Sequence, residues 1–147
     1  MIIFTEAESR TKILGQLAVF VCWLALTATA LMLDPSKSGH GTHTQLGLPP
    51  CGSVVLFHRP CPGCGLTTSI TSTLHGQLLY AMKANVFGPI LYGIFTAFAM
   101  IAIVSWVRKK KMDITTRAMN ISLLVLLGVY LAFGIARFIL VTNYLPY

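Results

Sequence analysis

Three apolar runs of more than twenty residues constrain the fold of this chain more than any other feature. They cover residues 13–33, 86–107 and 118–141, and Arg137 in the third run is the only charged residue in any of them. About twenty apolar residues in a helix that rises 1.5 Å per residue span the roughly 30 Å hydrocarbon core of a bilayer. The sequence therefore predicts an all-α integral membrane protein. Residues 1–147 would form a single membrane domain with three transmembrane helices in contact with the lipid bilayer.

The charges are few, 10% of residues, and give a net charge of +7 that is unevenly distributed. Five of the eleven basic residues lie between the second and third apolar runs. They are Arg108, Lys109, Lys110, Lys111 and Arg117. The positive-inside rule places this loop and the N-terminus in the cytoplasm, and residues 34–85 and the C-terminus outside. We expect a bacterial inner membrane, with the C-terminus in the periplasm and anionic lipids as partners of Arg108, Lys109, Lys110 and Lys111. Because the basic residues adjoin membrane spans, no nucleic-acid partner is expected.

The outer loop, residues 34–85, divides into three parts. Residues 34–50 are rich in Gly, Pro, Ser and Thr, which favour turns. Residues 51–58 form a short apolar run that fits either a strand or a segment that enters the membrane interface. Residues 66–84 predict an amphipathic helix, because apolar side chains recur every four residues. These are Leu66, Ile70, Leu74, Leu78 and Met82, whereas Thr67, Thr68, Thr71, Ser72 and Gln77 fall largely off that stripe. Such a helix would lie on the membrane surface or pack against the transmembrane bundle.

Four cysteines are present, and three of them fall in the outer loop. Cys22 lies in the middle of the first span, where a thiol usually acts as a small apolar side chain. Cys51, Cys61 and Cys64 would lie in an oxidising compartment, which permits a disulfide between two of them. An odd number of cysteines leaves one thiol over, for a metal, a partner chain or no bond at all.

Metal binding and thiol redox chemistry compete with the disulfide for these three cysteines. The sequence Cys61-Pro62-Gly63-Cys64-Gly65 turns the chain so that two thiolates can face one zinc ion. Cys51 would be the third ligand and His58, or else His40 or His43, the fourth. Alternatively, a helix that begins at this turn would activate Cys61 for disulfide exchange. Covalent c-type haem is excluded because Gly65 replaces the histidine of a CxxCH motif.

Arg137 is a functional candidate because ionisable residues inside a membrane span are costly. It lies about one turn from the outer end of its helix, so its side chain can extend to the headgroups. The alternative is a pairing with a group of the outer loop or of a partner.

The motif CPGCGLTT resembles the C-P-x-C-G-x-T-R signature of a family of small bacterial membrane proteins of unknown function. Cys61, Pro62, Cys64, Gly65 and Thr67 match that signature, and the likeness covers roughly residues 46–140. Ala84 and Asn85 also match in position and type. Thr68 replaces the usual arginine, and residues 86–89 replace a compact Asn-Pro entry into the next transmembrane helix. The resemblance implies a membrane fold and a bacterial setting but no chemistry.

The function predicted from these features is that of an accessory or scaffold subunit of a larger membrane complex, with other membrane proteins as partners. The non-membrane part is too small for an independent active site. The sequence contains no recognisable nucleophile–base pair or carboxylate dyad, so catalysis by this chain alone is not expected. The alternative is a metal-binding or thiol-redox membrane protein that uses the CPGC motif.

Overall fold

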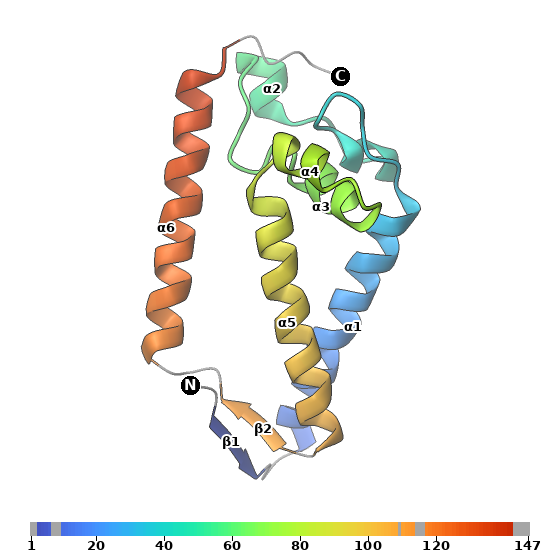
Figure 1. The fold of residues 1–147 in the computed structure, drawn as a ribbon, viewed down its shortest axis with the longest axis vertical. Coiled ribbons are helices and arrows are strands. Elements are labelled where there is room, and N and C mark those ends of the chain that lie inside the picture. Colours follow the sequence, from blue (N-terminus) through green and yellow to red (C-terminus); the bar gives the residue numbers. More distant parts are fainter. Residues whose placement is uncertain (1–2, 7–9, 109, 114–116, 143–147) are drawn as a thin grey trace.

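Three long helices dominate the computed structural model (Figure 1), which describes the backbone of residues 3–6, 10–108, 110–113 and 117–142, and the side chains of 14–108, 117 and 119–142. They are α1 (Arg10–Met32), α5 (Phe87–Val107) and α6 (Arg117–Leu140). Their segments Leu14–Met32, Phe87–Val107 and Met119–Leu140 are long and apolar enough to cross a membrane. The three predicted spans are confirmed, and the chain is a multi-pass membrane protein.

A short two-stranded ribbon is the part of the fold that the all-α prediction did not include. Strands β1 (Ile3–Glu6) and β2 (Lys110–Asp113) pair antiparallel at the end of the bundle where α1 begins and α5 ends (Figure 1). The strands have four residues each and β2 is mostly charged, so neither carries the apolar alternation that predicts a strand. Lys109 lies outside the described residues, and the side chains of Lys110 and Lys111 are not described.

The opposite end of the bundle is covered by residues 34–85, which we call the cap. It contains the 3₁₀ helix η1 (Thr42–Leu46) and the short helices α2 (Gly52–Phe57), α3 (Leu66–Leu74) and α4 (Leu78–Ala84). Most of residues 51–58 is therefore helical, so the prediction of a strand there is wrong. The prediction of one continuous helix over residues 66–84 is also wrong. The helix is interrupted at Gly76, whose φ of 75° is in the left-handed region.

Helix α3 buries polar side chains instead of presenting them to water. Thr68, Ser69, Thr71 and Ser72 are fully buried. The Ser72 hydroxyl donates to the Thr68 carbonyl at 2.7 Å, and Ser69 donates to the carbonyls of Ala81 and Asn85. Small hydroxyl side chains satisfied in this way let helices approach closely. Helix α3 therefore packs on α4, α5 and α1, which was the second of the two positions predicted for it.

Helices α1 and α5 pack along their length, whereas α6 stands apart from them in the lower part of Figure 1. The Trp23 indole donates to the Thr96 hydroxyl at 3.0 Å, and Thr27 and Tyr92 share a hydrogen bond of the same length. Helix α6 contacts the top of α5 through Phe87, whose ring lies 5.3 Å from that of Tyr130. Helix α6 also contacts the cap, through Phe138 against Phe57 and Arg59, and through Arg137 against Cys64.

The close packing of α3 on α5 predicts opposite effects for two glycines of the same helix. A Cβ at Gly88 would overlap the Ser69 side chain, which cannot move because it is buried and hydrogen-bonded, whereas a Cβ at Gly93 meets nothing within 4 Å. Gly88→Ala should destabilise the fold by about 1–3 kcal/mol. Gly93→Ala should be neutral or slightly stabilising. Thermal unfolding in detergent measures both, and equal melting temperatures for the two variants would contradict this packing.

Candidate metal centre

The turn that carries Cys61 and Cys64 is built by backbone hydrogen bonds and by one glycine. The Cys64 amide donates to the Cys61 carbonyl, and the Leu66 amide to the Gly63 carbonyl, both at 3.0 Å. Gly65 adopts a φ of 79° and ends the turn where α3 begins. A side chain there would collide with the backbone of Gly39 and Ala84, so the motif requires glycine at this position.

The side chain of Asn85 fixes this turn through hydrogen bonds. Its side-chain amide donates to the carbonyls of Pro62 at 3.3 Å and Cys64 at 3.2 Å, and its oxygen accepts from the Phe87 amide at 3.0 Å. The residue is buried, with 1% of its surface exposed. We did not predict this role from the sequence; the available signals were a polar side chain immediately before an apolar run and the match of Asn85 to the family pattern. Asn85 thus fixes the motif to the first turn of α5.

The three cap cysteines come together although Cys51 is ten residues away from Cys61. Cys51 directly precedes α2, which places its sulfur against the turn. The Sγ atoms are 3.5 Å apart for Cys51 and Cys61, 3.3 Å for Cys61 and Cys64, and 3.4 Å for Cys64 and Cys51. The predicted juxtaposition of Cys51, Cys61 and Cys64 is confirmed, and we call these three residues the thiol cluster.

The sulfur distances match a metal site better than a disulfide. A disulfide requires about 2.05 Å between sulfurs, and none of the three pairs in the cluster is at that distance. Two thiolates on one tetrahedral zinc, each at about 2.3 Å, are about 3.8 Å apart. The nearly equilateral triangle observed needs only a small expansion to reach that value. The expected disulfide is therefore not present in this structure.

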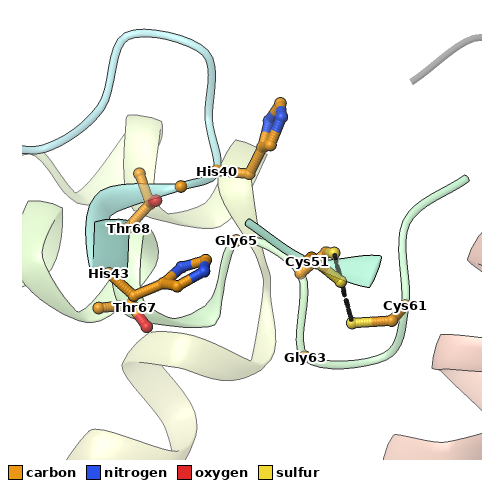
Figure 2. Close-up of a pocket in the computed structure, with 10 residues that line it drawn as sticks. His40, His43, Cys51, Cys61, Gly63, Gly65, Thr67 and Thr68 are labelled. Atoms are coloured by element: carbon orange, nitrogen blue, oxygen red, sulfur yellow. Dashed lines mark hydrogen bonds between the residues drawn. The ribbon is translucent and has the colours of Figure 1, made fainter. Parts of the chain in front are cut away.

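The thiol cluster forms one wall of a cavity of about 280 Å³ between the CPGC turn, η1 and the start of α3. Thr67, Thr68, His40 and His43 also line the cavity. Figure 2 shows the His43 ring extending toward the middle of the cavity, and the His40 ring turned away from the sulfurs. A hydrogen bond of 2.8 Å between the hydroxyls of Thr42 and Thr68 fixes η1 to α3.

The structure places the three histidines that were predicted as a possible fourth ligand in different surroundings. His58 is exposed at the C-terminal end of α2, adopts a φ of 51° and does not line the cavity. His43 is half-buried, and its Nε2 lies 3.3 Å from the Pro49 carbonyl. His40 is buried, with its Nδ1 at 3.0 Å from the Ser38 carbonyl. Among the described residues, no histidine nitrogen lies within 4.8 Å of all three sulfurs, and His43, whose ring extends into the cavity, is the histidine best placed for a fourth ligand.

The local environment shifts the pKa values of Cys51 and Cys64 in opposite directions. Burial raises the pKa of the Cys64 thiol, and hydrogen bonds with Cys61 and Cys51 raise it further. Burial acts in the same direction on Cys51. However, hydrogen bonds with Cys64 and Cys61, and the amides of Val54 and Ser53, outweigh it and lower the pKa of Cys51. In the metal-free protein, Cys51 is therefore a better nucleophile than Cys64.

Two arginines attach the site to α6. Arg137 donates to the Cys64 carbonyl at 3.1 Å, so it pairs with the outer loop, one of the two alternatives drawn from the sequence. Arg59, which was not singled out from the sequence, donates to the Phe138 carbonyl at 3.1 Å. A basic residue two positions before Cys61 was the only signal for it. Pro62 also packs so tightly on Gly134 that a Cβ there would overlap the proline ring.

The pKa difference predicts the order of thiol alkylation in reduced, metal-free protein. A lowered pKa leaves more thiolate at a given pH, so Cys51 should react with iodoacetamide at lower pH than an ordinary thiol. At about pH 7.5 its rate should exceed that of Cys64 at least tenfold. Mass spectrometry of the two peptides over time measures this difference, and denaturant should abolish it. A rate for Cys64 that equals or exceeds that of Cys51 would contradict the arrangement.

Comparison with known proteins gives one family match. No curated protein and no solved structure matches the chain significantly. Residues 51–99 match the model of a family described as Protein of unknown function (DUF2752). The match begins at Cys51, includes the CPGC turn and Asn85, and ends within α5. The resemblance to an uncharacterised family is confirmed over this segment, which contains the complete thiol cluster.

Proposed function

We propose that this protein is a membrane-embedded metal-binding protein that holds one thiophilic ion, Zn²⁺ foremost, through Cys51, Cys61 and Cys64. The observation that carries the proposal is the thiol cluster itself, whose three sulfur atoms lie within 4.8 Å of one another. Thiolate ligands select zinc and other soft or borderline ions over Mg²⁺ and Ca²⁺. A motif that places three thiols together without a bond between them is suited to an ion.

Three protein thiolates leave a fourth position on a tetrahedral ion, and this position decides what the site can do. A structural zinc site has four protein ligands, whereas a site with three can exchange its fourth ligand. The cavity beside the cluster offers room for His43, a water molecule or a small external ligand. We propose that His43 completes the site at rest, which leaves His58 as a surface residue.

The distribution of charge supports a location for the site. Arg108 is exposed at the end of the bundle opposite to the cap, where the backbone of Lys110 and Lys111 in β2 also lies. By the positive-inside rule we propose that this end faces the cytoplasm and the cap faces the periplasm of a bacterial inner membrane. Arg108, Lys109, Lys110 and Lys111 would then contact anionic lipids.

The metal site predicts one ion per chain. Protein purified in mild detergent under reducing conditions should contain about one equivalent of zinc by elemental analysis. Cys51→Ser, Cys61→Ser and Cys64→Ser should each lose it, because each removes one thiolate. His43→Ala should weaken binding, whereas Cys22→Ser and His58→Ala are matched controls that should retain the ion.

Two outcomes would contradict this proposal. One is wild-type protein that binds no zinc, cobalt or copper when each is supplied to the reduced form. The other is a quantitative disulfide within the thiol cluster, with the ion bound no more tightly after reduction. The second outcome would favour a structural disulfide or thiol redox chemistry.

A second function, that of an accessory subunit of a membrane complex, is favoured by the exposure of α6. Only 6% of the most apolar part of Met119–Leu140 is buried, against 17% for Phe87–Val107. We propose that other membrane proteins cover part of this surface, and that the chain has no catalysis of its own. This role is compatible with a bound metal.

The accessory role predicts co-purification with defined membrane proteins in constant proportion. Leu124 and Val129 are exposed on α6, so replacing both with tryptophan should add bulk where a partner helix would lie. Partners should be lost while the thermal stability of the isolated chain changes little. The same substitutions at Val21 and Leu24 of α1, which are similarly exposed, test whether the effect is specific to α6. Unchanged recovery of partners in both variants would contradict the role.

A further inference from the structure

We propose that Arg137 is a positioning residue of the metal site, which supplies the counter-charge of the metal–thiolate cluster and fixes its Cys64 ligand. This inference rests on the proposed metal-binding function. It assigns a role to the only charged residue within a predicted span, and it joins the third membrane helix to the site.

The position of Arg137 links α6 directly to a proposed ligand. One guanidinium nitrogen donates to the Cys64 carbonyl at 3.1 Å, and the guanidinium carbon lies 5.6 Å from the centre of the Phe133 ring. The side chain is half-buried beside the cap. The cation–π contact with Phe133, which lies one turn earlier on α6, restrains the guanidinium beside Cys64.

The Cys64 carbonyl is the point where two separate elements meet. It accepts from Arg137 of α6 and also from the Asn85 side chain at 3.2 Å. A carbonyl oxygen has two lone pairs, and these two donors use both of them. The backbone of Cys64 is thereby held from two sides, which restricts the direction in which its sulfur enters the cluster.

The charge balance explains why a cation is placed here. Among the side chains that the structure describes, no carboxylate forms an ion pair with Arg137, although an uncompensated charge at the membrane is costly. Three thiolates and one divalent ion carry a net charge of −1. The guanidinium charge of +1 is held against the backbone of one of the three ligands and is opposite in sign to that net charge. Arg137 and the loaded cluster therefore stabilise each other.

Arg59 provides a matched control for Arg137. It also donates one hydrogen bond of 3.1 Å to a backbone carbonyl, that of Phe138, and its guanidinium carbon lies 5.5 Å from the Phe138 ring. Both arginines join the cap to α6 in the same way. Only Arg137 bonds to the backbone of a proposed ligand. A loss of binding that follows Arg137 alone therefore reports on the site, not on the attachment of α6.

The test is a competition titration of Zn²⁺ and Co²⁺ against a chromophoric chelator, with reduced, metal-free, full-length protein in detergent. Removal of an outer-shell partner of a metal ligand costs 10–100-fold in affinity, so Arg137→Gln should weaken binding at least about 10-fold. Arg137→Lys keeps the charge and Arg59→Gln keeps the site, so both should stay within about threefold of the wild type. Saturated Arg137→Gln should still show the Co²⁺–thiolate charge-transfer band.

The outcomes separate this inference from the function on which it rests. Wild-type protein without metal affinity would overturn the metal-binding function itself. Normal affinity in Arg137→Gln, or equal losses in Arg137→Gln and Arg59→Gln, would overturn only the role of Arg137. If Arg137→Gln does not fold, Arg137→Lys decides, because a loss of 10-fold or more with the charge retained contradicts a counter-charge.

Discussion

One turn of the chain, residues 61–65, holds the third membrane helix to the other two. Below the turn, Asn85 binds the carbonyls of Pro62 and Cys64 and so fixes it to α5. Beside it, Pro62 packs into the gap at Gly134, and Arg137 reaches Cys64 from α6. The residues that set the distance between the helices also set the direction of the thiol side chains. Helix packing and the geometry of the cluster therefore depend on one set of contacts, and a bound ion would stabilise both by mass action.

The cap is stabilised by close polar packing in place of a large apolar core. Its residues are too few to bury much apolar surface, and its fully buried side chains include Thr42, Thr68, Ser69 and Thr71. Hydroxyl groups are small, and several of them donate to backbone carbonyls. Ser72 donates to Thr68 one turn away, and Ser69 donates to the carbonyls of Ala81 and Asn85 and packs against Gly88 of α5. Thr42 and Thr68 bond to each other and so join η1 to α3.

The sequence predicted the membrane helices well because about twenty consecutive apolar residues are enough to indicate a span, whatever the tertiary contacts. It also predicted that Cys61 and Cys64 would act with Cys51, from composition and spacing. It failed where tertiary contacts decide. Helix α3 is helical as expected, but several of its threonines and serines are buried by packing on α4 and α5, whereas Leu78 and Met82 of the predicted apolar stripe are exposed. The break at Gly76 was not predicted, although a glycine within a helical pattern lowers the helix propensity. The choice among His40, His43 and His58 could not be predicted, because it depends on how η1 folds back over the cluster.

The surroundings of the thiol cluster argue for a site that exchanges ligands over one that only stabilises the fold. The CPGC turn is already held by Asn85, Gly65 and α6, so an ion is not needed to form it, unlike the metal of a zinc finger. In the proposed metal-bound form, three thiolates concentrate negative charge beside the cavity. Of the two histidines that line the cavity, His43 extends toward its middle, and its Nε2 lies 3.3 Å from the Pro49 carbonyl. A ligand held so lightly can leave the ion and be replaced. The same cavity that admits His43 can then admit an external donor, which is what delivery or capture of an ion at a membrane surface requires.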